Sequence, residues 1–309
     1  MDEALIKLYQ RQGYKIIGKY GAVKLCLWTK KSILNRGFCY KQQFYGIQSH
    51  RCLQMTPNLT YCTQSCIFCW RSFQGTEIKM RDFDEPQEIV EKSIEAQRSL
   101  LIGYKGDEKA DKKKVEEAFE PKHVAISLAG EPTLYPKISE LIKYFHQRKM
   151  TTFLVSNGTN PDALLKMEPP TQLYITLAAP NENIYKKTCQ PLVPGNWDRL
   201  NKTLEILPSI KTRKVIRLTL VKGLNMTGVK GYAELIKKAS PNFVEVKAYM
   251  RVGFSRERLG EESMPRFEEI KSFADKLSDY SGYKIIDDKK DSRVVLLSAG
   301  NENRFLNLT

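Results

Sequence analysis

The sequence has no long hydrophobic run, no leader-like N-terminus and no even set of cysteines. No apolar run reaches the length that a helix needs to cross a bilayer, which excludes a membrane-spanning protein. The first residues, MDEALIKLYQ, lack the basic and apolar regions of a secretory leader. An odd count of seven cysteines fits disulfide pairing poorly. These absences predict a cytoplasmic protein, without a membrane partner, that keeps its thiols reduced.

Three cysteines lie close together in the stretch YCTQSCIFCW. Cys62, Cys66 and Cys69 are separated by three and then two residues, with no fourth thiol nearby. Close cysteines in a reducing compartment usually bind a metal or act in catalysis. Structural zinc prefers four ligands in two pairs, whereas three thiolates on a four-iron cluster leave one iron open to a small molecule. The spacing favours an iron–sulfur cluster, and the alternative is a zinc loop with a distant fourth ligand.

This CxxxCxxC pattern, followed by an aromatic residue, resembles the cluster motif of the radical S-adenosylmethionine superfamily. In that superfamily the open iron takes the amino and carboxylate groups of S-adenosyl-L-methionine. The resemblance implies a 4Fe-4S cluster on these three thiols. It also implies that Phe68, the aromatic residue before the third cysteine, lies near the adenine.

Short apolar runs, each ending in a Gly or Pro loop, recur along the chain and predict strands. Amphipathic helices separate them, and strands that alternate with helices predict parallel βα units. Six units predict an α/β fold, a partial (β/α)6 TIM-like barrel over residues 53–309, with residues 1–52 as an N-terminal extension packed on it. One further strand is expected in the tail, and a solvated charged helix or loop is expected at 104–120. The six runs lie at 51–57, 123–130, 151–159, 172–180, 214–223 and 243–253.

The last two of these runs carry polar residues on one face. Arg217 and Thr219 share a face in the fifth run, and Glu245 and Lys247 share a face in the sixth. Strands covered on both faces are normally apolar on both. The alternation therefore predicts an open, polar lumen, and edge strands facing water are the alternative.

The C-terminal ends of parallel barrel strands normally carry the chemistry. The second run ends in a Gly-Glu-Pro that resembles the superfamily motif whose backbone binds the methionine amino group. The third run ends in a polar turn whose hydroxyl and amide can bind a ribose or a carboxylate. The predicted cofactor-binding residues, besides Phe68, are Gly130, Glu131, Pro132, Ser156, Asn157 and Lys247.

Three more cysteines precede the loop, with twelve residues in each gap: Cys26, Cys39 and Cys52. Spacing alone allows a second cluster, and it also allows three buried apolar thiols. The stretches from Cys26 to Cys69, SLAGEPTLYP, LVSNGT and FVEVKAYMRVG together resemble the archaeal 4-demethylwyosine synthases. These radical enzymes act in wybutosine biosynthesis on tRNA.

That resemblance implies the reaction and its partners. N1-methylguanosine at position 37 of tRNA(Phe) condenses with two carbons of pyruvate to give 4-demethylwyosine. It implies two 4Fe-4S clusters, the second on the upstream triad, and S-adenosyl-L-methionine. It also implies that Lys41, two residues after the middle cysteine of the triad, binds pyruvate as a Schiff base. Without a flavodoxin-like domain, a separate protein is expected to donate electrons. A monomer is expected, and no role is assigned to Cys189.

The charge agrees with a nucleic-acid partner. Lys and Arg total 50 against 35 Asp and Glu, a formal net charge of +15, and basic proteins often meet polyanions. Candidate phosphate contacts are Lys112 to Lys114, Arg251, Arg256 and Arg258. Two alternatives stay open, another radical enzyme such as a glycyl-radical activase, and a non-enzymatic zinc-dependent protein that binds nucleic acid.

Overall fold

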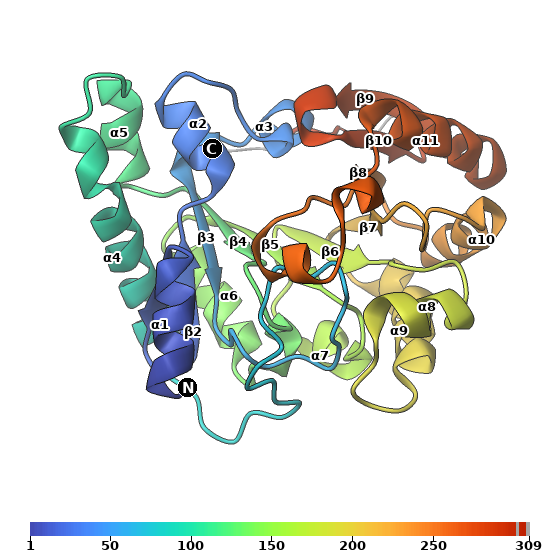
Figure 1. The fold of residues 1–309 in the computed structure, drawn as a ribbon, viewed down its shortest axis with the longest axis horizontal. Coiled ribbons are helices and arrows are strands. Elements are labelled where there is room, and N and C mark those ends of the chain that lie inside the picture. Colours follow the sequence, from blue (N-terminus) through green and yellow to red (C-terminus); the bar gives the residue numbers. More distant parts are fainter. Residues whose placement is uncertain (301–302, 307–309) are drawn as a thin grey trace. The chain divides into compact units, whose positions relative to one another are not determined.

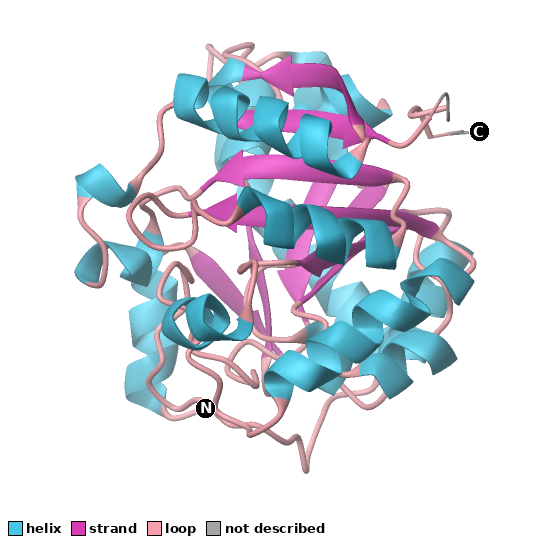
Figure 2. Ribbon diagram, turned by 90° about the vertical axis from the view of Figure 1, so that its right-hand side faces the viewer, coloured by secondary structure: helices cyan, strands magenta, loops and turns pink. Residues whose placement is uncertain are grey.

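A computed structural model describes residues 1–300 and 303–306 of the chain. Each apolar run that the sequence predicts to be a strand contains one, and so does the tail. Figure 2 shows helices alternating with these strands. The chain divides into two compact units, of residues 1–61, 74–154 and 304–309, and of residues 62–73 and 155–303. Whether residues 1–52 form an extension on a barrel of residues 53–309 stays a prediction.

The first unit contains a sheet with the strand order β1-β2-β3-β4-β5 (Figure 1). β3 pairs in parallel with β4, and β4 with β5, whereas β1, β2 and β3 pair antiparallel. The antiparallel β1–β2 hairpin was not predicted, because its strands have only four residues each. The strands are β1 (Tyr14–Ile17), β2 (Gly21–Lys24), β3 (Cys52–Thr56), β4 (His123–Ile126) and β5 (Thr151–Ser156), whose last two residues belong to the second unit.

The helices of the first unit pack on this sheet with their apolar faces. In α6 (Ile138–Gln147) the buried residues Ile138, Leu141, Ile142 and Phe145 recur at helical spacing. α4 contacts β1, β2 and β3, as well as α5 and α6. The charged segment at 104–120 contains the end of α4 and all of α5. The other helices are α1 (Glu3–Arg11), α2 (Leu27–Ile33), α3 (Tyr40–Tyr45), η1 (Ser49–Arg51), α4 (Pro86–Lys105), α5 (Lys112–Ala118) and η2 (Pro132–Leu134).

The C-terminal segment joins the first unit next to α3. The backbone N–H of Leu306 donates a hydrogen bond to the carbonyl oxygen of Tyr45, at 3.0 Å. The ring of Phe305 lies beside Gly46, which ends α3 with a left-handed φ of 79°. The short helix that carries Lys41 is therefore held by residues from the far end of the chain.

The second unit has the strand order β6-β7-β8-β10-β9. β6, β7 and β8 are parallel neighbours, and β10 pairs antiparallel with both β8 and β9. α11 packs on α10 and on β8, β9 and β10. The strands are β6 (Gln172–Thr176), β7 (Arg213–Leu220), β8 (Phe243–Ala248), β9 (Lys284–Lys289) and β10 (Val294–Ser298).

The remaining helices of the second unit connect these strands. They are α7 (Pro161–Lys166), α8 (Glu182–Cys189), α9 (Asn196–Ile206), η3 (Leu207–Ser209), α10 (Val229–Ala239), η4 (Gly253–Glu257), η5 (Glu261–Ser263), α11 (Phe267–Ser281) and η6 (Lys290–Ser292). Within the described residues, every helix is too short or too polar to span a bilayer.

Candidate active site

Cys62, Cys66 and Cys69 lie on a loop of irregular backbone in the second unit, residues 62–73. All three are partly exposed thiols. A tight turn, closed by the Cys69 N–H and the Cys66 carbonyl oxygen at 2.9 Å, brings the second and third cysteines together. Burial raises the pKa of the Cys69 thiol, and the positive charge of Arg71 opposes that shift. The loop thus carries three cysteines, of which Cys66 and Cys69 share one turn beside the cation of Arg71.

Backbone hydrogen bonds hold the first half of this loop against the segment after α8. Ser65 N–H donates to the carbonyl oxygen of Gln190 at 3.1 Å, and Leu192 N–H donates to that of Thr63 at 2.9 Å. The side-chain amide of Asn196 also donates to the Thr63 carbonyl oxygen, at 2.9 Å. These contacts fix the loop although it has no helix or strand of its own.

Asn157, predicted to bind the cofactor, lies beside the first cysteine. Its side-chain amide is 3.8 Å from the Cys62 sulfur and donates a hydrogen bond to Thr63 Oγ1 at 3.1 Å. Its side-chain oxygen accepts from the Thr159 N–H at 3.0 Å. Ser156 Oγ accepts from the Gly158 N–H at 3.0 Å. The polar turn after β5 therefore adjoins the cysteine loop, as the sequence pattern suggests.

Arg258 braces the cysteine loop from η4, a role that the sequence did not suggest. Its guanidinium donates to the carbonyl oxygens of Ile67 at 3.1 Å and Arg71 at 3.4 Å, and also to that of Cys69. It also stacks on the ring of Phe73, at 4.1 Å from the centroid. The guanidinium predicted to contact phosphate is thus engaged inside the protein. Burial lowers its pKa.

The other residues of the second unit named from the sequence lie apart from these contacts. Phe68 is half-buried on the cysteine loop. Lys247 donates through Nζ to the carbonyl oxygen of Ser292 at 2.6 Å. The roles of both in cofactor binding stay predictions.

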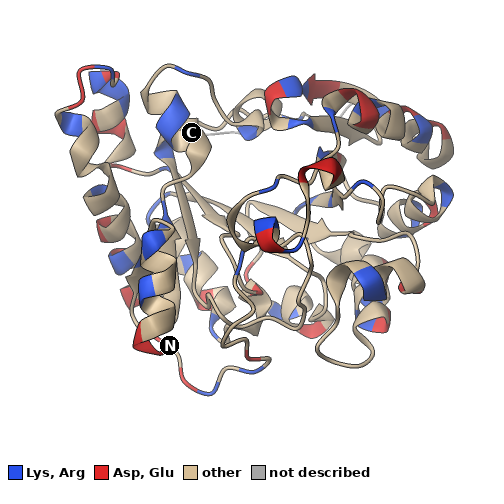
Figure 3. Cartoon of the chain, in the orientation of Figure 1, with Lys and Arg blue, Asp and Glu red and all other residues tan. Residues whose placement is uncertain are grey.

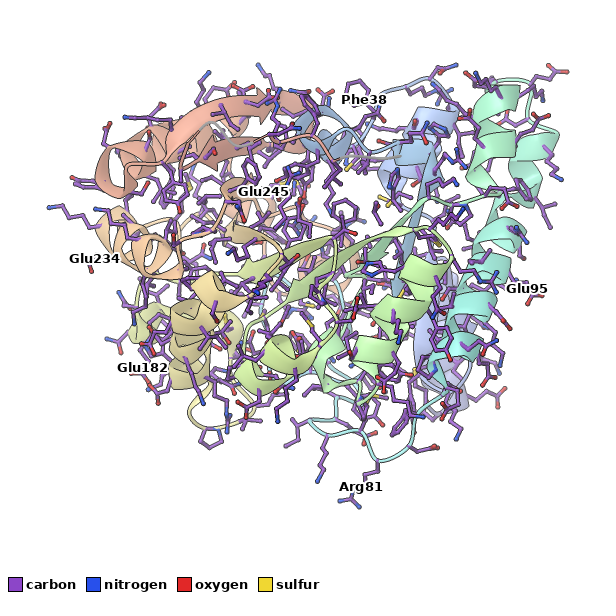
Figure 4. All side chains as sticks on the ribbon, turned by 180° about the vertical axis from the view of Figure 1, so that it is seen from behind. Phe38, Arg81, Glu95, Glu182, Glu234 and Glu245 are labelled. Atoms are coloured by element: carbon purple, nitrogen blue, oxygen red, sulfur yellow. The ribbon has the colours of Figure 1, made fainter. Side chains whose placement is uncertain are left out.

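The polar face of β7 and β8 contains a buried ion pair. Arg217 Nε donates to Glu245 Oε2 at 3.0 Å, and the side chains are 15% and 0% exposed. The Arg217 guanidinium also lies 4.2 Å from the ring centroid of Tyr174 on β6. Figure 4 shows Glu245 among packed side chains, whereas Glu182 and Glu234 project outward. The polar side chains on one face of these strands therefore include an internal ion pair, which was not predicted from the sequence.

In the first unit, the Gly-Glu-Pro after β4 adopts a backbone that only glycine permits. Gly130 has a φ of 76°, and a Cβ there would lie 2.2 Å from the carbonyl oxygen of Asn58. The next N–H, of Glu131, donates to the Tyr61 carbonyl oxygen at 2.7 Å. The Glu131 carboxylate accepts from Thr133 N–H and Oγ1, at 3.1 and 2.6 Å, and Pro132 begins η2.

The three upstream cysteines all lie in the first unit. Cys26 and Cys39 are the N-caps of α2 and α3, and Cys52 begins β3. Ser49 helps to gather them, because its Oγ accepts from the Cys39 N–H at 2.9 Å. Burial raises the pKa of Cys52 to about 12, the thiolate charges of Cys26 and Cys39 act in the same direction, and Lys41 opposes them. Cys52 is therefore close enough to Cys26, Cys39 and Lys41 for their charges to interact.

Lys41 lies in the first turn of α3 and is buried. Its Nζ is 4.5 Å from the ring centroid of Phe153 on β5. Phe44 packs edge-on against Tyr40, with 5.6 Å between the centroids. The Phe153 ring therefore gives this buried amine a partly apolar setting.

The chemistry of the thiol donors is compatible with iron–sulfur clusters. In the described part of the chain, no three His, Cys, Asp or Glu side chains converge closely enough to hold one metal ion. In a 4Fe-4S cluster each thiolate binds a different iron, so its ligands lie further apart than those of one ion. The donor set, sulfur from cysteine in both triads, matches what such clusters use.

The family models and the curated relatives that match this chain agree on one family. A family model described as "Radical SAM superfamily" matches residues 59–236, and one described as "Wyosine base formation" matches residues 238–299. A Pyrococcus abyssi protein, "S-adenosyl-L-methionine-dependent tRNA 4-demethylwyosine synthase", is 52% identical over 305 residues, covering 96% of this chain and 89% of that protein. The Methanocaldococcus jannaschii protein of the same name is 45% identical, covering 99% of each chain.

A solved structure agrees with these relatives. It is described as "Structure of TYW1 with a lysine-pyruvate adduct bound", is 43% identical, and covers 100% of this chain and 99% of that one, with a TM-score of 0.90. The α/β fold with a mostly parallel sheet is thus the radical S-adenosylmethionine fold.

Proposed function

The chain belongs to the S-adenosyl-L-methionine-dependent tRNA 4-demethylwyosine synthases, and we propose that it joins two carbons of pyruvate to N1-methylguanosine at position 37 of tRNA(Phe). The product is the tricyclic base 4-demethylwyosine, and the reaction makes the enzyme a carbon–carbon lyase. The observation that carries the proposal is a buried lysine near three cysteines, in a chain similar to one whose structure has a lysine–pyruvate adduct bound.

Family membership implies S-adenosyl-L-methionine and one 4Fe-4S cluster as cofactors. We assign the cluster to Cys62, Cys66 and Cys69. The assignment is supported by three partly exposed cysteines on one short loop, which Arg258 holds by hydrogen bonds. When bound, these cofactors supply an electron and a radical that takes a hydrogen atom from the substrate. The chain contributes the sulfur ligands and the fixed backbone around them.

The residues proposed to bind S-adenosyl-L-methionine differ in the support they have. Asn157 lies 3.8 Å from the Cys62 sulfur, which supports a role for it and for its neighbour Ser156 next to the cluster. For Gly130, Glu131 and Pro132 the support is their constrained backbone. The Glu131 carboxylate itself already accepts hydrogen bonds from Thr133. Phe68 and Lys247 rest on the family pattern alone.

A second 4Fe-4S cluster is proposed for Cys26, Cys39 and Cys52. Each thiol is partly exposed, and two of them extend from helix N-caps. The high pKa of Cys52 disfavours an unliganded thiolate there, so a bound cation would be needed to keep it deprotonated. A 4Fe-4S cluster held by these three thiols would have one iron without a protein ligand, and that iron could bind pyruvate or its adduct.

Lys41 is proposed to capture pyruvate covalently. Its Nζ attacks the keto carbon, the carbonyl oxygen leaves as water, and a carbon–nitrogen double bond forms. The amine must be neutral to attack, and an apolar setting favours the neutral form. Phe153, at 4.5 Å, together with the burial of Lys41 supports this role.

The basic composition supports the tRNA partner. Lys and Arg are spread over both units and gather on α2 and α5 (Figure 3). Of the predicted phosphate contacts, Lys113 is exposed, whereas Lys112 and Lys114 already bond to Asp107 and Asn35. Arg251 and Arg256 bond to main-chain oxygens of their own loop. An external one-electron donor, a monomeric state and a cytoplasmic location complete the proposal.

An anaerobic assay tests the proposed reaction. The iron-loaded protein is incubated with N1-methylated tRNA(Phe), pyruvate, S-adenosyl-L-methionine and dithionite, and the nucleosides are analysed by mass spectrometry. The tricyclic nucleoside should form only when all four are present, and carbon-labelled pyruvate should place two labelled carbons in it. Unmethylated tRNA is the control. A colourless protein that binds zinc and gives no product would overturn the proposal.

A further inference from the structure

One buried serine bonds to all three segments that carry the upstream cysteines. Ser49 is 1% exposed and begins η1, the short helix before β3. Its Oγ accepts a hydrogen bond from the N–H of Cys39 at 2.9 Å. Its own N–H donates to Gln42 Oε1 at 3.1 Å. Since Gln42 directly follows Lys41, this serine holds the start of α3 at two points.

The carbonyl oxygen of Ser49 connects the other two segments. It accepts from the N–H of Cys52, where η1 ends and β3 begins. It also accepts from Thr29 Oγ1 at 3.0 Å, and the same hydroxyl is 3.4 Å from the carbonyl oxygen of Cys52. Thr29 is itself 1% exposed and lies in α2, three residues after the N-cap Cys26. Residues three apart lie on the same side of a helix, so this bond holds the side of α2 that carries Cys26.

The segment around Ser49 is also anchored to the sheet of the first unit. The N–H of Gln48 donates to His123 Nε2 at 3.1 Å, and Nδ1 of the same ring is 2.7 Å from Thr151 Oγ1. His123 begins β4 and pairs with Cys52 of β3, and Thr151 begins β5. Ser49 is therefore fixed to the sheet without any help from a cysteine side chain.

The cysteine side chains do not hold these helix starts themselves. Cys26 and Cys39 are the N-caps of α2 and α3, and neither makes a side-chain capping bond. A threonine inside a helix commonly bonds to a carbonyl of its own helix. Thr29 instead donates to η1 and β3. Two hydroxyls thus hold the backbone of three segments that are distant in the sequence.

We propose that Ser49 and Thr29 are positioning residues that hold Cys26, Cys39 and Cys52 at the spacing that a 4Fe-4S cluster needs. This inference rests on the proposed function, because it assumes that the upstream triad binds the second cluster. Ligands on one short loop keep their spacing through the loop itself, whereas ligands from three segments depend on tertiary bonds. Groups that orient metal ligands without touching the metal typically change metal affinity about 10- to 100-fold when they are lost.

The test uses the full chain with Cys62, Cys66 and Cys69 replaced by alanine, so that bound iron reports on the upstream triad alone. Thr29→Val and Ser49→Ala each remove one hydroxyl bond between cysteine-bearing segments. Iron retention against a chelator and the reduction potential of the cluster are measured anaerobically. We expect both variants to retain iron about 10-fold less tightly than the parent, with a shifted potential. Thr29→Ser keeps the hydroxyl and should retain iron as the parent does.

Thr203→Val, in the same background, is the matched control. Thr203 is a buried threonine of α9 in the second unit, and its Oγ1 donates to the carbonyl oxygen of Gly158 at 2.6 Å. Without iron, its urea midpoint should fall about as far as that of Thr29→Val, but its iron should be held as in the parent.

The outcomes separate the two proposals. Iron held equally by the parent, Thr29→Val and Ser49→Ala would overturn the positioning role alone. So would equal iron loss in Thr29→Val and the control, because the loss would then follow general destabilisation. A Thr29→Ser variant that loses iron like Thr29→Val would also overturn it. A parent protein that binds no iron would overturn the proposed second cluster, and this inference with it.

Discussion

Arg258 Nε donates a hydrogen bond to the carbonyl oxygen of Ile67 at 3.1 Å, between residues 191 positions apart in the chain. The carbonyls of an irregular loop have no helix or sheet partners, and one guanidinium can satisfy several of them. Arg258 contacts three carbonyls of the cysteine loop and stacks on Phe73. The shape of the proposed cluster site thus depends on a side chain from a distant element.

Replacing Arg258 with Met should loosen that loop. Hydrogen bonds to charged groups contribute about 1.5 to 3 kcal/mol each, and solvent near the half-buried guanidinium reduces this, so we expect a loss of about 2 kcal/mol. Urea unfolding measures the loss, and iron analysis should show weaker retention at Cys62, Cys66 and Cys69. Arg256→Met is the control, since Arg256 is exposed, and its stability should stay within about 0.5 kcal/mol. Equal losses in both variants would contradict the bracing role.

Gly130→Ala should be far more damaging than Gly223→Ala. Both glycines have left-handed backbones, with φ values of 76° and 77°. A Cβ at Gly130 would collide with the Asn58 carbonyl oxygen, whereas a Cβ at Gly223 would meet nothing within 4 Å. The control should lose only the backbone cost of about 1 to 2 kcal/mol. Gly130→Ala should lose several kcal/mol more in urea unfolding, and similar losses would mean that the close approach is not needed.

Lys41→Arg keeps the charge but cannot form an imine. Borohydride added with pyruvate should trap an adduct on Lys41 in the unchanged protein, located by peptide mapping, and none in the variant. The variant should still cleave S-adenosyl-L-methionine but make no tricyclic product. Lys24→Arg is the matched control, because the Lys24 Nζ also lies 4.5 Å from an aromatic centroid, that of Tyr14. An adduct on another lysine, or product from Lys41→Arg, would remove Lys41 from the mechanism.

Alanine replacement of either cysteine triad should halve the iron content of the protein. Two 4Fe-4S clusters give about eight iron atoms per chain, and loss of either triad should leave about four. Without Cys62, Cys66 and Cys69, cofactor cleavage should stop even in the absence of tRNA. Without Cys26, Cys39 and Cys52, cleavage should continue while product formation fails. A variant of the upstream triad that retained all its iron would exclude the second cluster.

Glu245→Gln should destabilise the second unit strongly, because it leaves the Arg217 guanidinium without its buried counter-ion. Breaking such a pair costs about 3 to 5 kcal/mol, whereas replacing both members with apolar residues is often neutral. The double variant Arg217→Met with Glu245→Leu should therefore be more stable than Glu245→Gln alone. Urea unfolding of Arg217→Met, Glu245→Leu and the double variant gives the coupling energy. A double variant that loses the sum of the single losses would argue against a coupled pair.

The regular part of the fold could be predicted from the sequence. Runs of β-branched residues that end at Gly or Pro predicted six strands, and 3.6-residue periodicity predicted α6 and α10. The β1–β2 hairpin escaped because four-residue strands carry little pattern. Local propensity was thus sufficient only where segments were long enough to show a period.

The candidate site could also be predicted only in part from the sequence. Cys62, Cys66, Cys69 and the Gly-Glu-Pro at 130–132 stand in short motifs, so a resemblance to the superfamily could name them, and their roles stay predictions. Arg258 and Cys189 carry no motif, and their contacts with the loop depend on tertiary pairing across long stretches of chain. The charge partner of Glu245 depends on the register of β7 and β8, which polarity alone does not define.

The hydrogen bond between Leu306 and Tyr45 has a consequence for synthesis on the ribosome. The chain emerges N-terminus first, and early segments begin to fold while later ones are still being made. β2, β3 and β4 can pair once residue 126 has emerged, but α3 gains this C-terminal contact only after residue 306 has emerged. A shorter nascent chain therefore lacks that support for the helix bearing Lys41.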